Sequence, residues 1–81
     1  MSHDRLHARK PTHEIERWSV GTIERVTERD GHCVFDVRTD RNETVELTVT
    51  VAIGELVLSR LDLEEGESPV GARVWYRTYG G

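Results

Sequence analysis

The sequence is poor in cysteine and in long apolar runs, and each shortage excludes a class of protein. Cys33 is the only cysteine, so no disulfide can form within these 81 residues. No apolar run approaches the ~20 residues that a membrane-spanning helix needs, and the first residues lack the apolar segment of a signal peptide. We therefore expect a soluble, cytoplasmic protein that binds no membrane.

The positive charges are almost all arginine. Ten arginines accompany a single lysine, Lys10, and 15 acidic residues bring the formal net charge to −4. This avoidance of lysine with an excess of acids resembles the bias of haloarchaeal proteins, although a GC-rich genome in ordinary salt accounts for it equally well. In molar salt the Debye length falls to ~3 Å, so stacking at contact range would have to provide any affinity for nucleic acid.

The first sixteen residues are a polar N-terminal arm, and residues 17–81 form one small domain. After Met1 the arm has only three apolar side chains, Leu6, Ala8 and Ile15, and Pro11 interrupts it. Because so little apolar surface can be buried there, we expect residues 1–16 to be flexible or docked only at their end.

The clearest local pattern is a strict alternation of polar and apolar residues over 44–51. It predicts a half-buried strand that continues to about Ile53. Before it, Asp30-Gly31 is typical of a tight hairpin turn, joining a strand that begins near residue 17 to a strand over 32–39. The apolar residues change parity near Gly21, which predicts a β-bulge at that position. The three strands are expected to form an antiparallel meander.

The last third of the chain adds a helix and a final strand. Apolar spacing predicts a short helix over 55–62, with a fourth strand as a close alternative, and the acidic run 64–69 indicates a loop. The final strand runs from residue 70 or 72 to Tyr79. The order β-β-β-α-β predicts a mainly β domain, a small antiparallel sheet or partly open barrel that resembles OB-fold and SH3-like barrels. Either the arm or a second copy, in a homodimer, should cover its exposed edge.

The final strand is the strongest candidate for a binding surface, because its alternate residues are cations and aromatic rings. The residues on that face are Arg73, Trp75, Arg77 and Tyr79. They point outward if the smaller residues between them point inward. Interleaved guanidinium groups and rings are typical of surfaces for single-stranded nucleic acid, where rings stack on bases at ~1–3 kcal/mol each. Trp18 and Arg25 extend the patch if the first strand lies beside the last.

Two other interpretations of these residues stand beside that one. Trp75 can be the largest residue of the hydrophobic core, with the neighbouring arginines reaching over it to water. If the aromatic residues are exposed, they can instead bind a protein partner or a second copy of the chain. Arginine and aromatic side chains are favoured at both kinds of interface, so composition does not separate them.

The chain ends in Gly80-Gly81, which resembles the terminus of ubiquitin-like modifiers and sulfur-carrier proteins. That resemblance implies activation of the Gly81 carboxylate, with the slender Gly80 beside it in the enzyme cleft. The β-grasp fold of those families places its helix after the first hairpin, whereas here three predicted strands precede any helix. Conjugation is therefore the third candidate function.

Residues capable of catalysis or metal binding are scattered. His3, His7 and His13 lie in the arm, and His32 and Cys33 point to opposite sides of a strand, so they offer zinc no closely spaced ligands. Cys33 is expected to point into the core, where a thiol is inert. No glycine-rich phosphate loop is present. We expect a non-enzymatic binding protein without a metal or cofactor.

Overall fold

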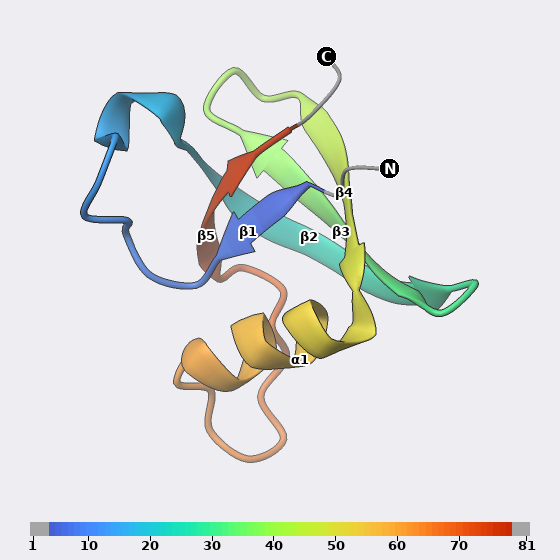
Figure 1. The fold of residues 1–81 in the computed structure, drawn as a ribbon. Coiled ribbons are helices and arrows are strands. Elements are labelled where there is room, and N and C mark those ends of the chain that lie inside the picture. The colour runs from blue at the N-terminus through green and yellow to red at the C-terminus, as the bar shows by residue number, and fades with distance from the viewer. Residues whose placement is uncertain (1–3, 79–81) are drawn as a thin grey trace.

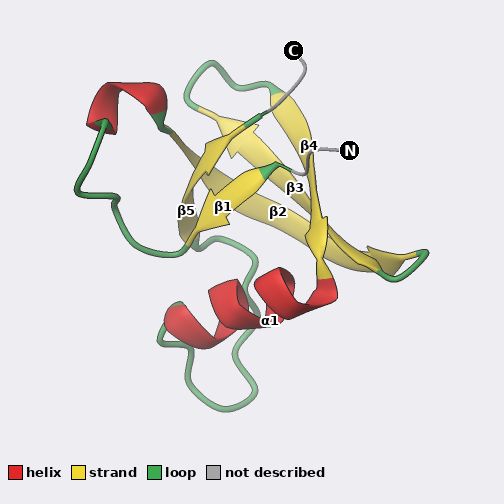
Figure 2. Ribbon diagram, in the orientation of Figure 1, coloured by secondary structure: helices red, strands yellow, loops and turns green. Residues whose placement is uncertain are grey.

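The computed structural model describes residues 4–78, which form one sheet of five antiparallel strands and a single α-helix (Figure 1). In chain order the elements are β1 (Arg5–His7), the 3-10 helix η1 (Ile15–Arg17), β2 (Ser19–Arg29), β3 (His32–Thr39), β4 (Thr44–Thr50), α1 (Val51–Arg60) and β5 (Arg73–Arg77). Across the sheet the order is β1-β5-β2-β3-β4. Figure 2 shows the sheet curled, with α1 across one end. The predicted class, mainly β with a partly open barrel, is confirmed.

The fifth strand, β1, lies in the segment that the sequence assigns to a flexible arm. Its three residues pair with β5, and Leu6 stands opposite Tyr76. Leu6 is buried in the core while the residues on either side of it are exposed. Residues 5–7 are therefore part of the sheet. Three residues are too few to show a strand period, and it is the long-range pairing with β5 that orders them.

The two edges of the sheet, β1 and β4, approach each other without pairing as strands. The backbone N–H of Thr48 in β4 donates a hydrogen bond of 3.0 Å to the carboxylate of Asp4, just before β1. This hydrogen bond satisfies one donor on the exposed edge of β4, and the barrel stays partly open because the two edge strands do not pair. The sequence analysis expected either the arm or a second copy of the chain to cover the exposed edge, and the arm does contact it through Asp4.

The β-bulge lies at Glu24 and not at Gly21, where the sequence pattern predicted it. The register between β2 and β3 shifts between Ile23 and Arg25, while Gly21 pairs regularly with Thr39. The apolar residues change parity near Gly21 because Val20 lies on the outer face, opposite Trp75, whereas Ile23 points into the core. The inward position between them is Gly21. A Cβ there would collide with the Val37 side chain and lie 2.8 Å from the carbonyl oxygen of residue 38.

The hydrophobic core fills the inner side of the curled sheet. The alternation predicted for β4 is confirmed, since Leu47 and Val49 are buried and their neighbours are less so. The inward residues of the other elements complete one cluster: Leu6, Ile23, Cys33, Phe35, Val37, Val57, Val74 and Tyr76. No helix within residues 4–78 is long and apolar enough to cross a membrane.

The helix begins at Val51, directly after β4, and ends at Arg60, so the predicted helix over 55–62 and the strand reaching Ile53 were both misplaced. The Thr50 hydroxyl accepts a hydrogen bond of 3.3 Å from the Ile53 N–H and caps the first turn. Gly54 allows α1 to press against β3, because a Cβ there would overlap the Cys33 side chain. Cap and packing outweigh the strand preference of the β-branched residues at 51 and 53.

Replacing Val49 by aspartate should unfold the domain, because an unpaired carboxylate would be enclosed at a position only 1% exposed. Thr50→Asp is the matched control. This side chain is exposed, and aspartate can take over the capping hydrogen bond, so its melting temperature should stay close to that of the natural protein. Circular dichroism melts measure both variants, and equal losses would show that the faces of β4 are misassigned.

Gly54→Ala should destabilise the domain, although alanine favours a helix by about 1 kcal/mol over glycine. The added methyl would lie 2.7 Å from the Cys33 Cβ, and overpacking of this kind costs about 1–3 kcal/mol. The exposed substitution Ala52→Gly measures the propensity difference in the same helix. Urea unfolding compares the free energies, and a Gly54→Ala protein more stable than the natural one would contradict the close contact of α1 with β3.

Candidate functional site

The outer face of β5 presents Arg73, Trp75 and Arg77, as in the first of the interpretations drawn from the sequence. Val74 is fully buried and Tyr76 is 8% exposed on the inner side, so Arg73, Trp75 and Arg77 alternate with them on the outer side. Trp75 is half-buried and is not a member of the core cluster. Its cross-strand neighbours are His7 of β1 and Val20 of β2.

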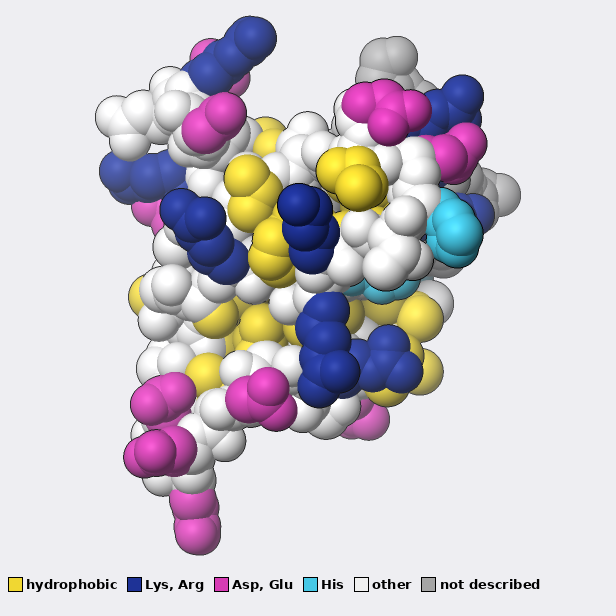
Figure 3. Space-filling model, turned by 90° about the vertical axis from the view of Figure 1, so that its left-hand side faces the viewer, with side chains coloured by type: hydrophobic (Ala, Val, Ile, Leu, Met, Phe, Trp, Pro, Cys, Tyr) yellow, Lys and Arg dark blue, Asp and Glu magenta, His cyan; other side chains and the backbone are white. Residues whose placement is uncertain are grey.

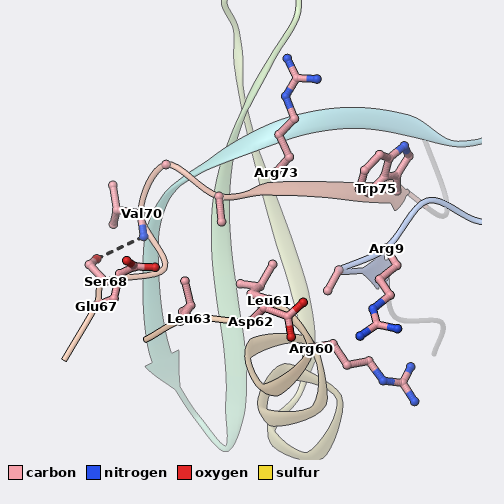
Figure 4. Close-up of a pocket in the computed structure, with 13 residues that line it drawn as sticks. Arg9, Arg60, Leu61, Asp62, Leu63, Glu67, Ser68, Val70, Arg73 and Trp75 are labelled. Carbon is pink, nitrogen blue, oxygen red and sulfur yellow. Dashed lines mark hydrogen bonds between the residues drawn. The ribbon is translucent and has the colours of Figure 1, made fainter. Parts of the chain in front are cut away.

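An open hollow of about 600 Å³ lies beside Trp75 (Figure 4). Its walls come from the residues after β1, the end of α1 and the loop that leads into β5. Apolar side chains contribute part of the lining, including Ala8, Leu61 and Leu63. Three arginines also line it, namely Arg9 from the arm, Arg60 from the last turn of α1 and Arg73 from β5. Residues 8–9 and the segment from residue 60 to residue 75, which are distant in the sequence, thus form one site.

Within the part of the chain that the structure describes, the three arginines of the hollow have no acidic partner. Among residues 4–78, none of the three makes a salt bridge or a side-chain hydrogen bond. Other arginines are engaged within the protein, since the Arg38 guanidinium lies 2.6 Å from the Glu24 carboxylate and Arg25 lies 3.5 Å from Asp36. The carboxylates of Asp62 and Glu67 also line the hollow, so its wall carries three cations and two anions, and the three guanidinium groups are available to a ligand.

Figure 3 shows the side of the molecule on which β1 and β5 lie. Lysine and arginine side chains are spread over its middle with hydrophobic side chains between them, and acidic side chains gather mainly toward its upper and lower ends. The formal net charge of −4 is thus unevenly distributed over the surface. An anionic ligand would meet a locally basic face on a protein that is acidic as a whole.

Trp18 is occupied by contacts within the protein. The His7 ring meets it edge-on at 4.7 Å between centroids, and the Arg77 guanidinium carbon lies 5.6 Å from its ring centre. Arg77 also approaches the Glu14 carboxylate at 4.0 Å. The cluster of His7, Trp18 and Arg77 fastens the arm to the outer face of the sheet, beside Trp75.

The structure separates the predicted site residues into three groups. Arg73 and Trp75 line the hollow, whereas Trp18 and Arg77 form the neighbouring cluster. Arg25 lies beyond the end of the pairing between β2 and β5, which stops at Thr22, and its side chain pairs with Asp36 of β3. Tyr79, Gly80 and Gly81 lie outside the described residues.

Arg9 and Arg60 are the residues of the hollow that the sequence did not indicate. Arg9 lies in a polar arm, and Arg60 ends a helix, where basic residues are common because they complement the helix dipole. Neither position has a local pattern that points to a ligand. Only the pairing of β1 with β5 and the packing of α1 bring them to Trp75.

The other polar groups of the described residues show no sign of a reactive nucleophile or a metal site. Burial, followed by the nearby charges of Glu28 and Glu55, raises the pKa of the buried Cys33 thiol, which disfavours the reactive thiolate. Within residues 4–78, no three histidine, cysteine or acidic side chains are grouped closely enough to hold a metal ion. The hollow beside Trp75 is therefore the site with the most evident capacity to bind a ligand.

Comparison with known proteins places the chain in a family. One family model matches residues 1–78, and its description is Family of unknown function (DUF7861). The chain belongs to the DUF7861 family. No curated protein and no solved structure matches it. The DUF7861 match includes every residue that lines the hollow and ends before Tyr79.

His7 should make the stability of the domain depend on pH. Partial desolvation of the His7 ring, followed by the charges of Arg60 and Arg5, lowers its pKa from the ordinary 6.5. The unfolded chain therefore binds a proton at higher pH than the folded protein does. The free energy of unfolding should decrease as the pH falls from above 6.5 through the lowered pKa of His7 in the folded protein.

The measurement is the change in melting temperature between about pH 7.5 and pH 5. His7→Gln should reduce this change, because glutamine does not titrate. His13→Gln, in the exposed loop before η1, is the control and should behave as the natural protein does. An identical pH dependence of all three proteins would contradict the role assigned to His7.

Proposed function

We propose that this domain is a non-enzymatic binding module that contacts single-stranded nucleic acid through Trp75 and the arginines around it. The observation that supports the proposal most is the half-exposed indole on the outer face of β5, beside a hollow with three arginines that have no acidic partner among residues 4–78. A stacking ring next to unneutralised guanidinium groups suits a ligand made of flat bases and phosphates.

The arrangement assigns separate tasks to the aromatic and the basic residues. A base stacked on Trp75 contributes about 1–3 kcal/mol whatever its identity, because every base has a π-face. Arg9, Arg60 and Arg73 would contact the phosphates on either side of it. Small partly open β-barrels present strand faces of this kind to oligonucleotides, as the OB-fold does.

The dependence of binding on salt follows from these separate roles, stacking by Trp75 and phosphate contacts by the arginines. If three arginines contact phosphates, the logarithm of the binding constant should fall against the logarithm of salt with a slope of about −2. In a halophilic archaeal host, which the shortage of lysine suggests, stacking on Trp75 would provide most of the remaining affinity. The unpaired Cys33 suits a reducing, cytoplasmic setting.

Replacing Trp75 by leucine tests the proposal, because leucine preserves apolar volume and removes the stacking ring. The affinity for a single strand of about eight nucleotides should fall about 5- to 100-fold. Fluorescence anisotropy of a labelled oligonucleotide at low salt measures the dissociation constant. Arg73→Ala should also weaken binding. Arg25→Ala is the control, since this arginine is paired with Asp36 away from the hollow.

Two results would count against the proposal. If the natural protein binds no single strand at low salt, the proposed function is excluded. If Trp75→Leu is folded by circular dichroism and binds as tightly as the natural protein, the contact surface does not include the outer face of β5.

Binding to a protein partner, or to a second copy through a sheet edge, is the second candidate. Ile53 and Leu56 of α1 are 41% and 42% exposed and lie beside a small hollow that Leu6 and His7 also line. A mass that rises with concentration in sedimentation, without oligonucleotide binding, would favour this function. Conjugation through Gly81 is the third candidate, and the intact mass of the protein from its own host tests it.

A further inference from the structure

A smaller hollow lies on the outer side of the sheet, where β2, β3 and β5 run side by side. It measures about 130 Å³, and Thr22, Arg38 and Arg73 are among the residues that line it. We refer to it as the Thr22 hollow. Pockets that enclose a whole small molecule usually measure about 300–1,000 Å³, so this space suits a group of the size of a phosphate rather than a base.

The strand registers place these three side chains in one row across the sheet. Thr22 of β2 stands opposite Arg73 of β5 on one side and opposite Arg38 of β3 on the other. Gly21 and Ile23, its neighbours in β2, are buried on the inner side, so the Thr22 side chain points outward. Residues directly opposite each other have Cβ atoms about 4.5–5.5 Å apart, so both guanidinium groups can reach the space above the threonine.

Two members of the row have donors that no group of the protein uses. Within residues 4–78, the Thr22 hydroxyl makes no hydrogen bond, and the Arg73 guanidinium makes neither a hydrogen bond nor a salt bridge. Thr22 is half-buried, whereas Arg73 is exposed. A hydroxyl beside an unpaired guanidinium group suits an anion whose oxygens accept a hydrogen bond from each of them.

Arg38 stands at the other end of the row in a fixed geometry. Its Nε and Nη2 donate to Glu24 Oε2 at 2.9 and 2.6 Å, and its Nη1 donates to Asn42 Oδ1 at 2.9 Å. These bonds leave further N–H groups of the guanidinium for a ligand, and they hold the side chain in place before a ligand arrives. Glu24 neutralises much of this charge, and Asp40, which also lines the Thr22 hollow, is exposed to screening by salt. The unneutralised charge of the site therefore comes from Arg73.

The row lies close to the ring on which a base would stack. Arg73 and Trp75 are two residues apart on β5, which corresponds to about 6.5 Å, and Figure 4 shows their side chains on the same side of the strand. Val20, which stands opposite Trp75, also lines the Thr22 hollow. A single nucleotide spans this separation from its base to its phosphate.

We infer that the Thr22 hollow binds the phosphate next to the base that stacks on Trp75. The Arg73 guanidinium pairs with its charge, the Thr22 hydroxyl donates a hydrogen bond to one of its oxygens, and Arg38 closes the far side. This inference rests on the proposed function and adds a defined phosphate site to it. The bound strand then runs along the outer face of β5, beside β2.

Thr22→Val tests the inference, because valine keeps the branched shape that favours a strand and lacks the hydroxyl. The affinity for labelled oligo-dT of about eight nucleotides, measured by fluorescence anisotropy at low salt, should fall about 3- to 10-fold, as expected for one lost hydrogen bond. Thr22→Ser keeps the hydroxyl and should bind as the natural protein does. Thr27→Val is the matched control, since it makes the same change at a half-buried position of β2 that does not line the Thr22 hollow.

A double variant shows whether the hydroxyl and the guanidinium group hold the same phosphate. If they do, Thr22→Val combined with Arg73→Ala should weaken binding by less than the product of the two single losses, because the contacts are coupled through one group. Losses that simply multiply would overturn the inference.

The inference is also overturned if Thr22→Val, folded by circular dichroism, binds as tightly as the natural protein, or if Thr22→Ser or Thr27→Val loses as much affinity as Thr22→Val. In each of these cases, weaker binding by Trp75→Leu leaves the proposed function standing. A natural protein that binds no oligo-dT would overturn both.

Discussion

Burial of Val74 and Tyr76 on the inner side of β5 is the constraint on which the candidate site depends. Successive side chains of a strand point to opposite faces, so fixing these two inward fixes Arg73 and Trp75 outward. β5 lies between β1 and β2 and pairs with both, which locks its register from two sides. A slip by one residue would bury an arginine and expose the core residues, at a cost too large for a domain of this size.

The arm and the helix complete the site, although neither resembles a binding element by itself. Leu6 anchors β1 in the core, and the contacts of His7 and Arg77 with Trp18 hold the arm on the outer face, which brings Arg9 to the hollow. At the other side, the missing side chain of Gly54 lets α1 pack closely on β3, and its last turn supplies Arg60. The stability of the fold and the shape of the site therefore share the same contacts.

Local pairing of charges, and not the net charge, decides where this acidic protein can attract an anion. Arg25 and Arg38 lie close to carboxylates on neighbouring strands, so much of their charge is neutralised within the protein. The arginines of the hollow have no such partners among residues 4–78.

Short-range patterns in the sequence determined the meander, its hairpin turn at Asp30-Gly31 and the faces of β4, because period-two alternation and left-handed turn residues are local properties. The alternation in β5 was also visible in the sequence, but only the burial of Val74 and Tyr76 decided which of its two faces points inward. Tertiary structure alone decided that residues 5–7 form a strand, that the bulge lies at Glu24 and that the helix begins at Val51. It also placed Arg9 and Arg60 beside Trp75. These features depend on contacts between segments distant along the chain, and a local pattern contains no information about which distant residues will meet.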